Sequence, residues 1–152
     1  QQGKVMIYGA TGAVGTAAIE LAKHYGAHVT AVCSPQGASL AKSLGADTLI
    51  DYTKDDLRQL DASFDIVFDA VGKIKKREIK HLLTKGGRYI TVGGMDVAKE
   101  TGTQLAVLST LFDEGKLHAS IEKVYALEDA AQAHAHVDSG RKKGNVVIRL
   151  ED

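Results

Sequence analysis

The sequence contains one cysteine and one proline, and each scarcity excludes a class of structure. Cys33 alone cannot close an internal disulfide or supply the cysteine cluster of a structural zinc site. With Pro35 as the single proline, no stretch is typical of a proline-rich linker between domains. Two histidines, His134 and His136, share a predicted helix but are two residues apart and so face different directions. We therefore expect a single domain over residues 1–152 and no metal site.

The chain also lacks an excess of charge of either sign. Nineteen basic and nineteen acidic side chains cancel, so no overall field attracts nucleic acid or an anionic membrane. No apolar run reaches the roughly 18 residues that span a bilayer, and no signal peptide opens the sequence. We therefore expect a cytoplasmic protein whose partners include neither a membrane nor a nucleic acid.

What the chain does have is a glycine turn between a strand and a helix. Val5–Tyr8 is a short, mostly apolar run, as in a parallel strand covered on both faces. Gly9, Gly12 and Gly15 follow at three-residue spacing, and apolar residues then recur at helical intervals up to Tyr25. A helix N-terminus approached by a glycine turn can bind a pyrophosphate, so a dinucleotide site is predicted. The alternative is a glycine-rich turn that binds no ligand, because G-x-x-G-x-x-G departs from the usual fingerprint.

The same alternation continues along the chain. Further strands are predicted at residues 27–33, 48–50, 64–68 and 88–92, with helices at 39–44, 55–60 and 74–83. This pattern predicts a doubly wound α/β fold, a three-layer αβα Rossmann fold with a parallel sheet. After Gly102 the pattern is less regular, with helices near 105–112 and 128–137 and strands at 121–125 and 145–150. These last elements either extend the sheet or pack on its edge.

Ligands of such sheets bind at the carboxyl ends of the strands, which here include Ser34 and Tyr52. No acidic residue occurs between Glu20 and Asp47, so the second strand ends without the carboxylate that an NAD site uses on the ribose. A serine there can donate to a 2′-phosphate, which favours NADP(H), although Ser34 could also be an ordinary turn residue and Tyr52 a partly buried aromatic. Asp69 is predicted to accept loop N–H groups and not to act as a catalytic acid.

With these residues placed, the sequence resembles the cofactor-binding domain of the medium-chain dehydrogenase/reductase superfamily, close to its zinc-independent quinone oxidoreductase branch. The matching phrases include YGATGAVG, ELAKHYGAHVTAVCS, SLGADTLIDY, FDIVFDAVG, LLTKGGRYITVGG and the segment from DEGKLHAS to GNVVI. The resemblance implies NADPH-dependent reduction of a quinone or activated alkene. It also implies a cofactor site of eight residues: Thr11, Gly12, Ala13, Val14, Ser34, Tyr52, Val71 and Gly93. The first four would hold the pyrophosphate, the next two the adenosine 2′-phosphate, and the last two would lie near the nicotinamide ribose.

Two departures from the family shape the functional expectation. We expect the family's N-terminal barrel-like domain, which contributes much of the substrate pocket, to be absent, because the sequence begins only a few residues before its first strand, and the connection between Gly94 and Leu105 is short. Both departures suggest a cofactor domain that is separated from its catalytic domain and has no catalytic residue of its own. A homodimer of this domain is a further expectation. The alternative is a regulatory module that senses the nucleotide without catalysis. A complete small reductase ranks third, because no tyrosine carries the Tyr-x-x-x-Lys pairing of short-chain enzymes.

Overall fold

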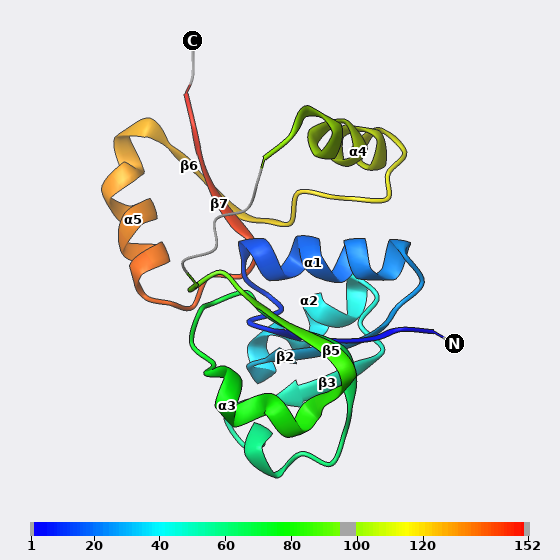
Figure 1. Ribbon diagram of the computed structural model, residues 1–152. Coiled ribbons are helices and arrows are strands. Elements are labelled where there is room, and N and C mark those ends of the chain that lie inside the picture. Colours follow the sequence, from blue (N-terminus) through cyan, green and yellow to red (C-terminus); the bar gives the residue numbers. More distant parts are fainter. Residues whose placement is uncertain (1, 95–99, 151–152) are drawn as a thin grey trace.

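The computed structural model describes residues 2–94 and 100–150, and a parallel sheet lies at its centre (Figure 1). The sheet has five strands in the order β3-β2-β1-β4-β5, and every neighbouring pair is parallel. The order turns back at β1, which is the switch point of a doubly wound fold. The strands are β1 (Lys4–Tyr8), β2 (His28–Cys33), β3 (Thr48–Asp51), β4 (Phe64–Asp69) and β5 (Leu83–Thr91).

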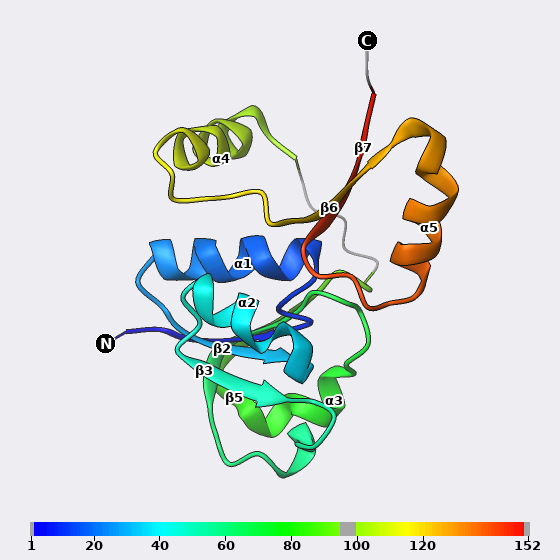
Figure 2. The same ribbon diagram turned by 180° about the vertical axis from the view of Figure 1, so that it is seen from behind.

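Helices cover both faces of this sheet, as Figures 1 and 2 show. On one face lie α1 (Ala13–His24) and α2 (Ala38–Ser43), which follows the 3₁₀ turn Pro35–Gly37. On the other lie the short helix α3 (Lys76–Ile79) and its 3₁₀ continuation Lys80–Leu82. The predicted three-layer α/β Rossmann fold is therefore confirmed.

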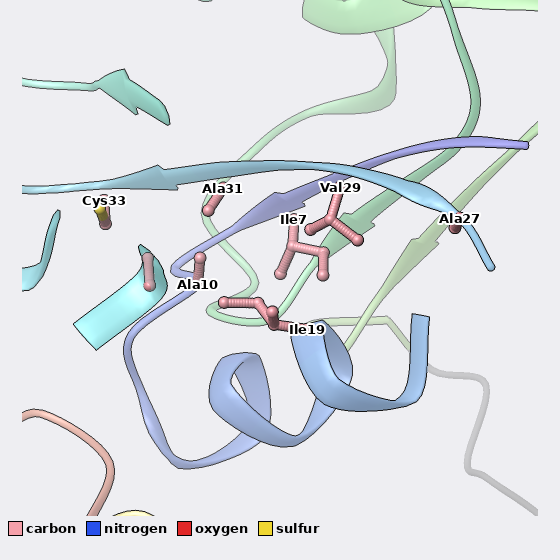
Figure 3. Close-up of a cluster of buried hydrophobic side chains, with 8 residues drawn as sticks. Ile7, Ala10, Ile19, Ala27, Val29, Ala31 and Cys33 are labelled. Carbon is pink, nitrogen blue, oxygen red and sulfur yellow. The ribbon is translucent and has the colours of Figure 1, made fainter. Parts of the chain in front are cut away.

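Each face of the sheet has its own apolar core. Figure 3 shows the cluster under α1 and α2, where Ile19 of α1 points at Ile7 and Val29 of the central strands. The second cluster packs Ile79 and Leu82 against the opposite face. Because strands β1 and β2 are buried on both sides, they read in the sequence as continuous apolar runs and not as alternating ones.

A glycine stands at each end of helix α1. Gly12 is the N-cap residue, in extended conformation, and no side chain caps the helix. At the other end Gly26 has φ +75°, the left-handed conformation that terminates helices, and its N–H donates to the carbonyl of Lys23. The chain then returns directly into β2, which gives the crossover between parallel strands.

The last third of the chain does not extend the sheet. It forms α4 (Gly102–Asp113), β6 (Ile121–Ala126), the 3₁₀ turn Leu127–Asp129, α5 (Ala130–Asp138) and β7 (Asn145–Arg149). Strands β6 and β7 pair with each other in a separate parallel sheet, while α4 lies beyond α1, away from the main sheet (Figure 1). Glu20 of α1 is only 8% exposed, and its carboxylate accepts a hydrogen bond from the backbone N–H of His118 and also pairs with Nδ1 of the His118 ring. These contacts attach the segment between α4 and β6 to α1.

Three local predictions differ from the structure. Residues 55–60 form only the 3₁₀ turn Leu57–Gln59, since the Asp56 carboxylate accepts from the Arg58 backbone and guanidinium. The helix predicted at 74–83 is limited to 76–82. The strand predicted at 88–92 begins earlier, at Leu83, and contains Gly86 and Gly87 at a register shift. The short connection after Gly94 includes residues 95–99, which lie outside the described residues.

Candidate functional site: a cavity over the glycine turn

A cavity of about 740 Å³ opens at the carboxyl ends of β1, β2 and β3 and the loop after β4. Five of the eight predicted site residues line it: Thr11, Gly12, Ser34, Tyr52 and Val71. The structure thus brings together side chains from four separate loops at the switch point, where ligands of such sheets bind.

The three glycines of the turn differ in what they do for the protein itself. A Cβ at Gly15 would lie 2.2 Å from the carbonyl oxygen of Gly9, so only glycine lets α1 approach the strand. Gly9 has φ +73°, and a Cβ there would lie 2.0 Å from Cγ2 of Val71. At Gly12 the nearest atom would be the Gly9 oxygen at 3.5 Å, an ordinary contact. The protein's packing therefore requires glycine at 9 and 15 but leaves the space over Gly12 open.

Ala13 and Val14 form the first turn of α1 and do not line the cavity. The N–H of Gly12 donates to the Gly9 carbonyl and that of Thr16 to the Gly12 carbonyl, and the first turn holds no acidic side chain. The positive end of the helix dipole consequently meets no carboxylate of its own helix. A phosphate at Gly12 would receive this field.

Ser34 and Tyr52 lie on neighbouring loops of the cavity wall. The Ser34 side chain caps nothing in the 3₁₀ turn that it precedes, and the Tyr52 ring, 48% exposed, lies 6.0 Å from the ring of Tyr8. Asp51 faces Cys33 across the strand pair. Burial and the charge of Asp51 raise the pKa of the buried Cys33 thiol, which keeps it protonated.

Asp51, the last residue of β3, brings a carboxylate beside the end of β2 that the preference for NADP(H) predicted from the sequence did not take into account. It belongs to the next strand, and its Oδ1 accepts from the Thr53 backbone N–H at 2.9 Å and from the Thr53 hydroxyl at 2.6 Å. The hydroxyl hydrogen bond lowers the pKa of Asp51, so the side chain carries a negative charge at neutral pH. This charge bears on the choice between NADP(H) and NAD(H).

The loop after β4 is built on Asp69. The Asp69 carboxylate accepts from the backbone N–H groups of Val71, Gly72 and Ile74 at 2.8–3.0 Å, as predicted. Val71 lines the cavity and is 44% exposed. Gly93 does not line it; a Cβ there would lie 2.7 Å from Cα of Gly72, so the two loops touch backbone to backbone.

A basic wall of the cavity was not predicted. Lys73, Arg141, Lys142 and Lys143 all line it, the last three from the loop between α5 and β7. This loop is anchored on the glycine turn, because the N–H of Gly144 donates to the Thr11 carbonyl at 2.8 Å. The segment RKKG is visible in the sequence, but nothing local indicates that it meets a turn 130 residues earlier.

The part of the chain that the structure describes has neither a metal-binding cluster nor a membrane-spanning helix. Within residues 2–94 and 100–150, no three His, Cys, Asp or Glu side chains gather as a metal site would require. Nor does any helix of that part have the length and apolar character needed to cross a membrane.

Comparison with known proteins assigns the chain to a family. A family model described as zinc-binding dehydrogenase matches residues 13–138. The chain belongs to this family. Within it the chain is a quinone oxidoreductase-like member of the medium-chain dehydrogenase/reductase superfamily, as its sequence motifs predicted.

Among its relatives in this superfamily, the 2-methylene-furan-3-one reductase of Solanum lycopersicum is 33% identical over 154 residues, covering 95% of this chain and 39% of the relative. The chloroplastic NADPH-dependent alkenal/one oxidoreductase of Arabidopsis thaliana is 31% identical, covering 95% of this chain and 40% of the relative. The quinone oxidoreductase of Coxiella burnetii superposes with a TM-score of 0.80 at 25% identity, covering 99% of this chain and 54% of that structure. The chain thus spans between two fifths and about half of the length of these proteins.

Proposed function

We propose that this chain is the NADP(H)-binding domain of an NADPH-dependent reductase whose full-length form transfers hydride to quinones or activated alkenes. The observation that carries the proposal is the cavity at the switch point, with the open Gly12 backbone on one side and a basic wall on the other. The names of the two plant relatives, one a furanone reductase and one NADPH-dependent, support the same class.

The glycine turn would receive the pyrophosphate. Thr11 and Gly12 line the cavity directly, and Ala13 and Val14 begin the helix whose dipole points at it. Because no side chain stands over Gly12, the phosphate can come within hydrogen-bonding distance of the backbone. The cofactor supplies the hydride when bound, and these residues bind and orient it.

The 2′-phosphate of NADP(H) would lie between Ser34 and the basic wall. The sequence left no cation nearer than Lys42 downstream of Ser34, but Arg141, Lys142 and Lys143 supply positive charge from the end of the chain. Arginine suits this role because its planar guanidinium can bind two phosphate oxygens at once. These cations oppose the negative charge of Asp51, which is already hydrogen-bonded to Thr53.

A nucleotide-sensing module without catalysis is the second candidate, and one observation favours it. Asp69, the carboxylate nearest the loop of Val71, is fully buried and already accepts three backbone N–H groups, so it is not available as an acid or base. Both candidates require the same cofactor site, and a turnover assay separates them.

Calorimetric titration of the chain with NADPH and with NADH tests the site. We expect the parent to bind NADPH more tightly than NADH. Arg141→Ala should raise the Kd of NADPH about tenfold, which is the effect of losing a charge-assisted hydrogen bond, and should change the Kd of NADH less than about twofold. Lys85→Ala is the matched control, since it removes an exposed cation at the opposite end of the sheet. Equal affinities of the parent for the two nucleotides would contradict the assignment to NADP(H).

A further inference from the structure

Asp69 is a completely buried carboxylate at the carboxyl end of β4. Moving a carboxylate out of water is costly unless hydrogen bonds replace its hydration. Here four donors surround it: three backbone N–H groups and the Thr91 hydroxyl at 3.3 Å, while the Tyr89 hydroxyl, 3.4 Å from Oδ2, donates its single proton to the Ile74 carbonyl. No lysine or arginine forms an ion pair with it in the described ranges, so neutral donors alone satisfy this carboxylate.

The backbone donors all belong to the loop that reaches the cavity. Oδ1 accepts from Val71 at 3.0 Å and from Gly72 at 2.8 Å, and Oδ2 accepts from Ile74 at 2.8 Å. This arrangement fixes where the Val71 side chain stands. Val71 in turn fills the space beside Gly9 that a Cβ at Gly9 would need. The carboxylate therefore sets the distance between the loop after β4 and the glycine turn.

A second connection runs from Asp69 to the loop after β5. The Thr91 hydroxyl donates to Oδ2 of Asp69 and accepts from the backbone N–H of Gly93 at 3.0 Å. The backbone of Gly93 also lies against that of Gly72, where a Cβ on either glycine would approach within 2.8 Å of the other's Cα. Asp69 thus orders two loops at once, and both are among the predicted neighbours of the nicotinamide ribose.

We propose that Asp69 is a positioning residue for the reactive half of the cofactor. Its carboxylate places Val71 and Gly93 as one rigid surface for the nicotinamide ribose, while the adenosine half depends on other loops. This inference rests on the proposed function. A residue needed only for folding would affect both halves of the ligand, whereas a positioning residue here affects only the half that meets its loops.

The experiment compares two ligands in two matched variants. Asp69→Asn keeps the side chain's size but turns one acceptor oxygen into a donor that faces N–H groups. Asp65→Asn is the control at the opposite end of β4, where Asp65 accepts from the Lys4 N–H at 2.9 Å and the Thr84 hydroxyl at 3.0 Å. The ligands are NADPH and 2′,5′-ADP, which contains the adenosine and its 2′-phosphate but no nicotinamide.

We expect Asp69→Asn to raise the Kd of NADPH about tenfold, the effect of an unsatisfied buried donor, and to change the Kd of 2′,5′-ADP less than about twofold. Asp65→Asn should change neither the Kd of NADPH nor the Kd of 2′,5′-ADP. Equal losses for both ligands, or no loss for NADPH, would overturn the proposal. If Asp69→Asn does not fold, Thr91→Val removes the link to Gly93 alone, and the same selective loss of NADPH affinity is expected.

A parent chain that binds neither ligand would refute the proposed function, and amide exchange then decides the structural half of the inference. In Asp69→Asn or Thr91→Val, hydrogen exchange measured by NMR should accelerate at Gly93, two residues beyond the end of β5. The Thr16 amide, which is bonded to Gly12 in the first turn of α1, should exchange as in the parent. Unchanged exchange at Gly93 in the variant would overturn the connection from Asp69 to this loop.

Discussion

Gly12→Val separates the binding role of the glycine turn from its role in packing. Gly12 is the N-cap of α1 with φ −79° and ψ 178°, an extended conformation that valine adopts readily. A Cβ would meet only the Gly9 oxygen at 3.5 Å, so the fold tolerates the first added carbon. The branched side chain would instead occupy the cavity, where we place the pyrophosphate.

The expected size of the effect follows from the hydrogen bonds that the displaced phosphate can no longer accept. A hydrogen bond to a charged group contributes about 1.5–3 kcal/mol, so displacing a phosphate from two backbone donors costs about 3 kcal/mol or more. That corresponds to a Kd at least about 100-fold higher. Valine is also a poorer N-cap than glycine, which lowers the stability by about 1 kcal/mol and Tm by roughly 2–4 °C for a chain of this length.

Calorimetric titration with NADPH and thermal unfolding measure the two effects independently. Gly102→Val is the matched control, because Gly102 is the first residue of α4 and an added Cβ there would meet no atom within 4 Å. Gly102 does not line the cavity. Gly15→Ala marks the opposite case, since its Cβ would collide with Gly9 and Ala10 and should prevent folding. A folded Gly12→Val protein that binds NADPH as tightly as the parent would refute the placement of the pyrophosphate.

Further predictions concern specificity, pH and turnover. Ser34→Asp should weaken NADPH binding at least about tenfold through like-charge repulsion while sparing NADH, and titration with both nucleotides would show a uniform loss if Ser34 were only a turn residue. Asp47 accepts from Lys23 at 2.8–2.9 Å and from the Val29 N–H at 2.7 Å, and the bonds from Lys23 lower the pKa of Asp47. A lowered folded-state pKa stabilises the protein above the unfolded value near 4 and loses that contribution as the pH falls through the folded value. In urea unfolding, Asp47→Asn should therefore be less stable than the parent by about 1 kcal/mol at pH 7 and equal to it near pH 2, and a gap that persists in acid would contradict this. The chain alone should oxidise NADPH with small quinones far more slowly than a two-domain relative does. Hydride transfer needs the acceptor held in an enclosed cleft, and this chain spans only part of its relatives' length. Comparable rates would show that the active site is built within these residues.

The elements that the sequence predicted well are those whose signals are local. The first strand, the glycine turn and α1 follow from apolar spacing within 20 residues, and Gly26 ends the helix with a positive φ. The early start of β5 was not predicted for the same reason, since adjacent glycines such as Gly86 and Gly87 normally mark a turn. In the structure Gly86, with φ +88°, lies at an irregularity of β5, where the register against β4 shifts.

What the sequence could not predict depends on contacts between distant residues. The pairing of β6 with β7 and the basic wall both require the chain to return to its beginning, and no local pattern specifies that return. The resemblance to the superfamily assigned Ser34 and Tyr52, which both line the cavity, to the 2′-phosphate, and it gave no role to Arg141. Asp69 shows the intermediate case: its position at a strand end predicted a loop acceptor, while its link through Thr91 to Gly93 emerged only from the geometry.

The hydrogen bond from Gly144 to Thr11 also has a consequence for synthesis of the protein. The ribosome synthesises residues 1–94, and with them all five strands of the main sheet, before it synthesises the basic loop at 141–143. A nascent chain can therefore complete its central sheet while its cavity still lacks one wall. Premature termination after α5 would yield a product that has all five strands of the main sheet but lacks Arg141, Lys142 and Lys143 on the cavity.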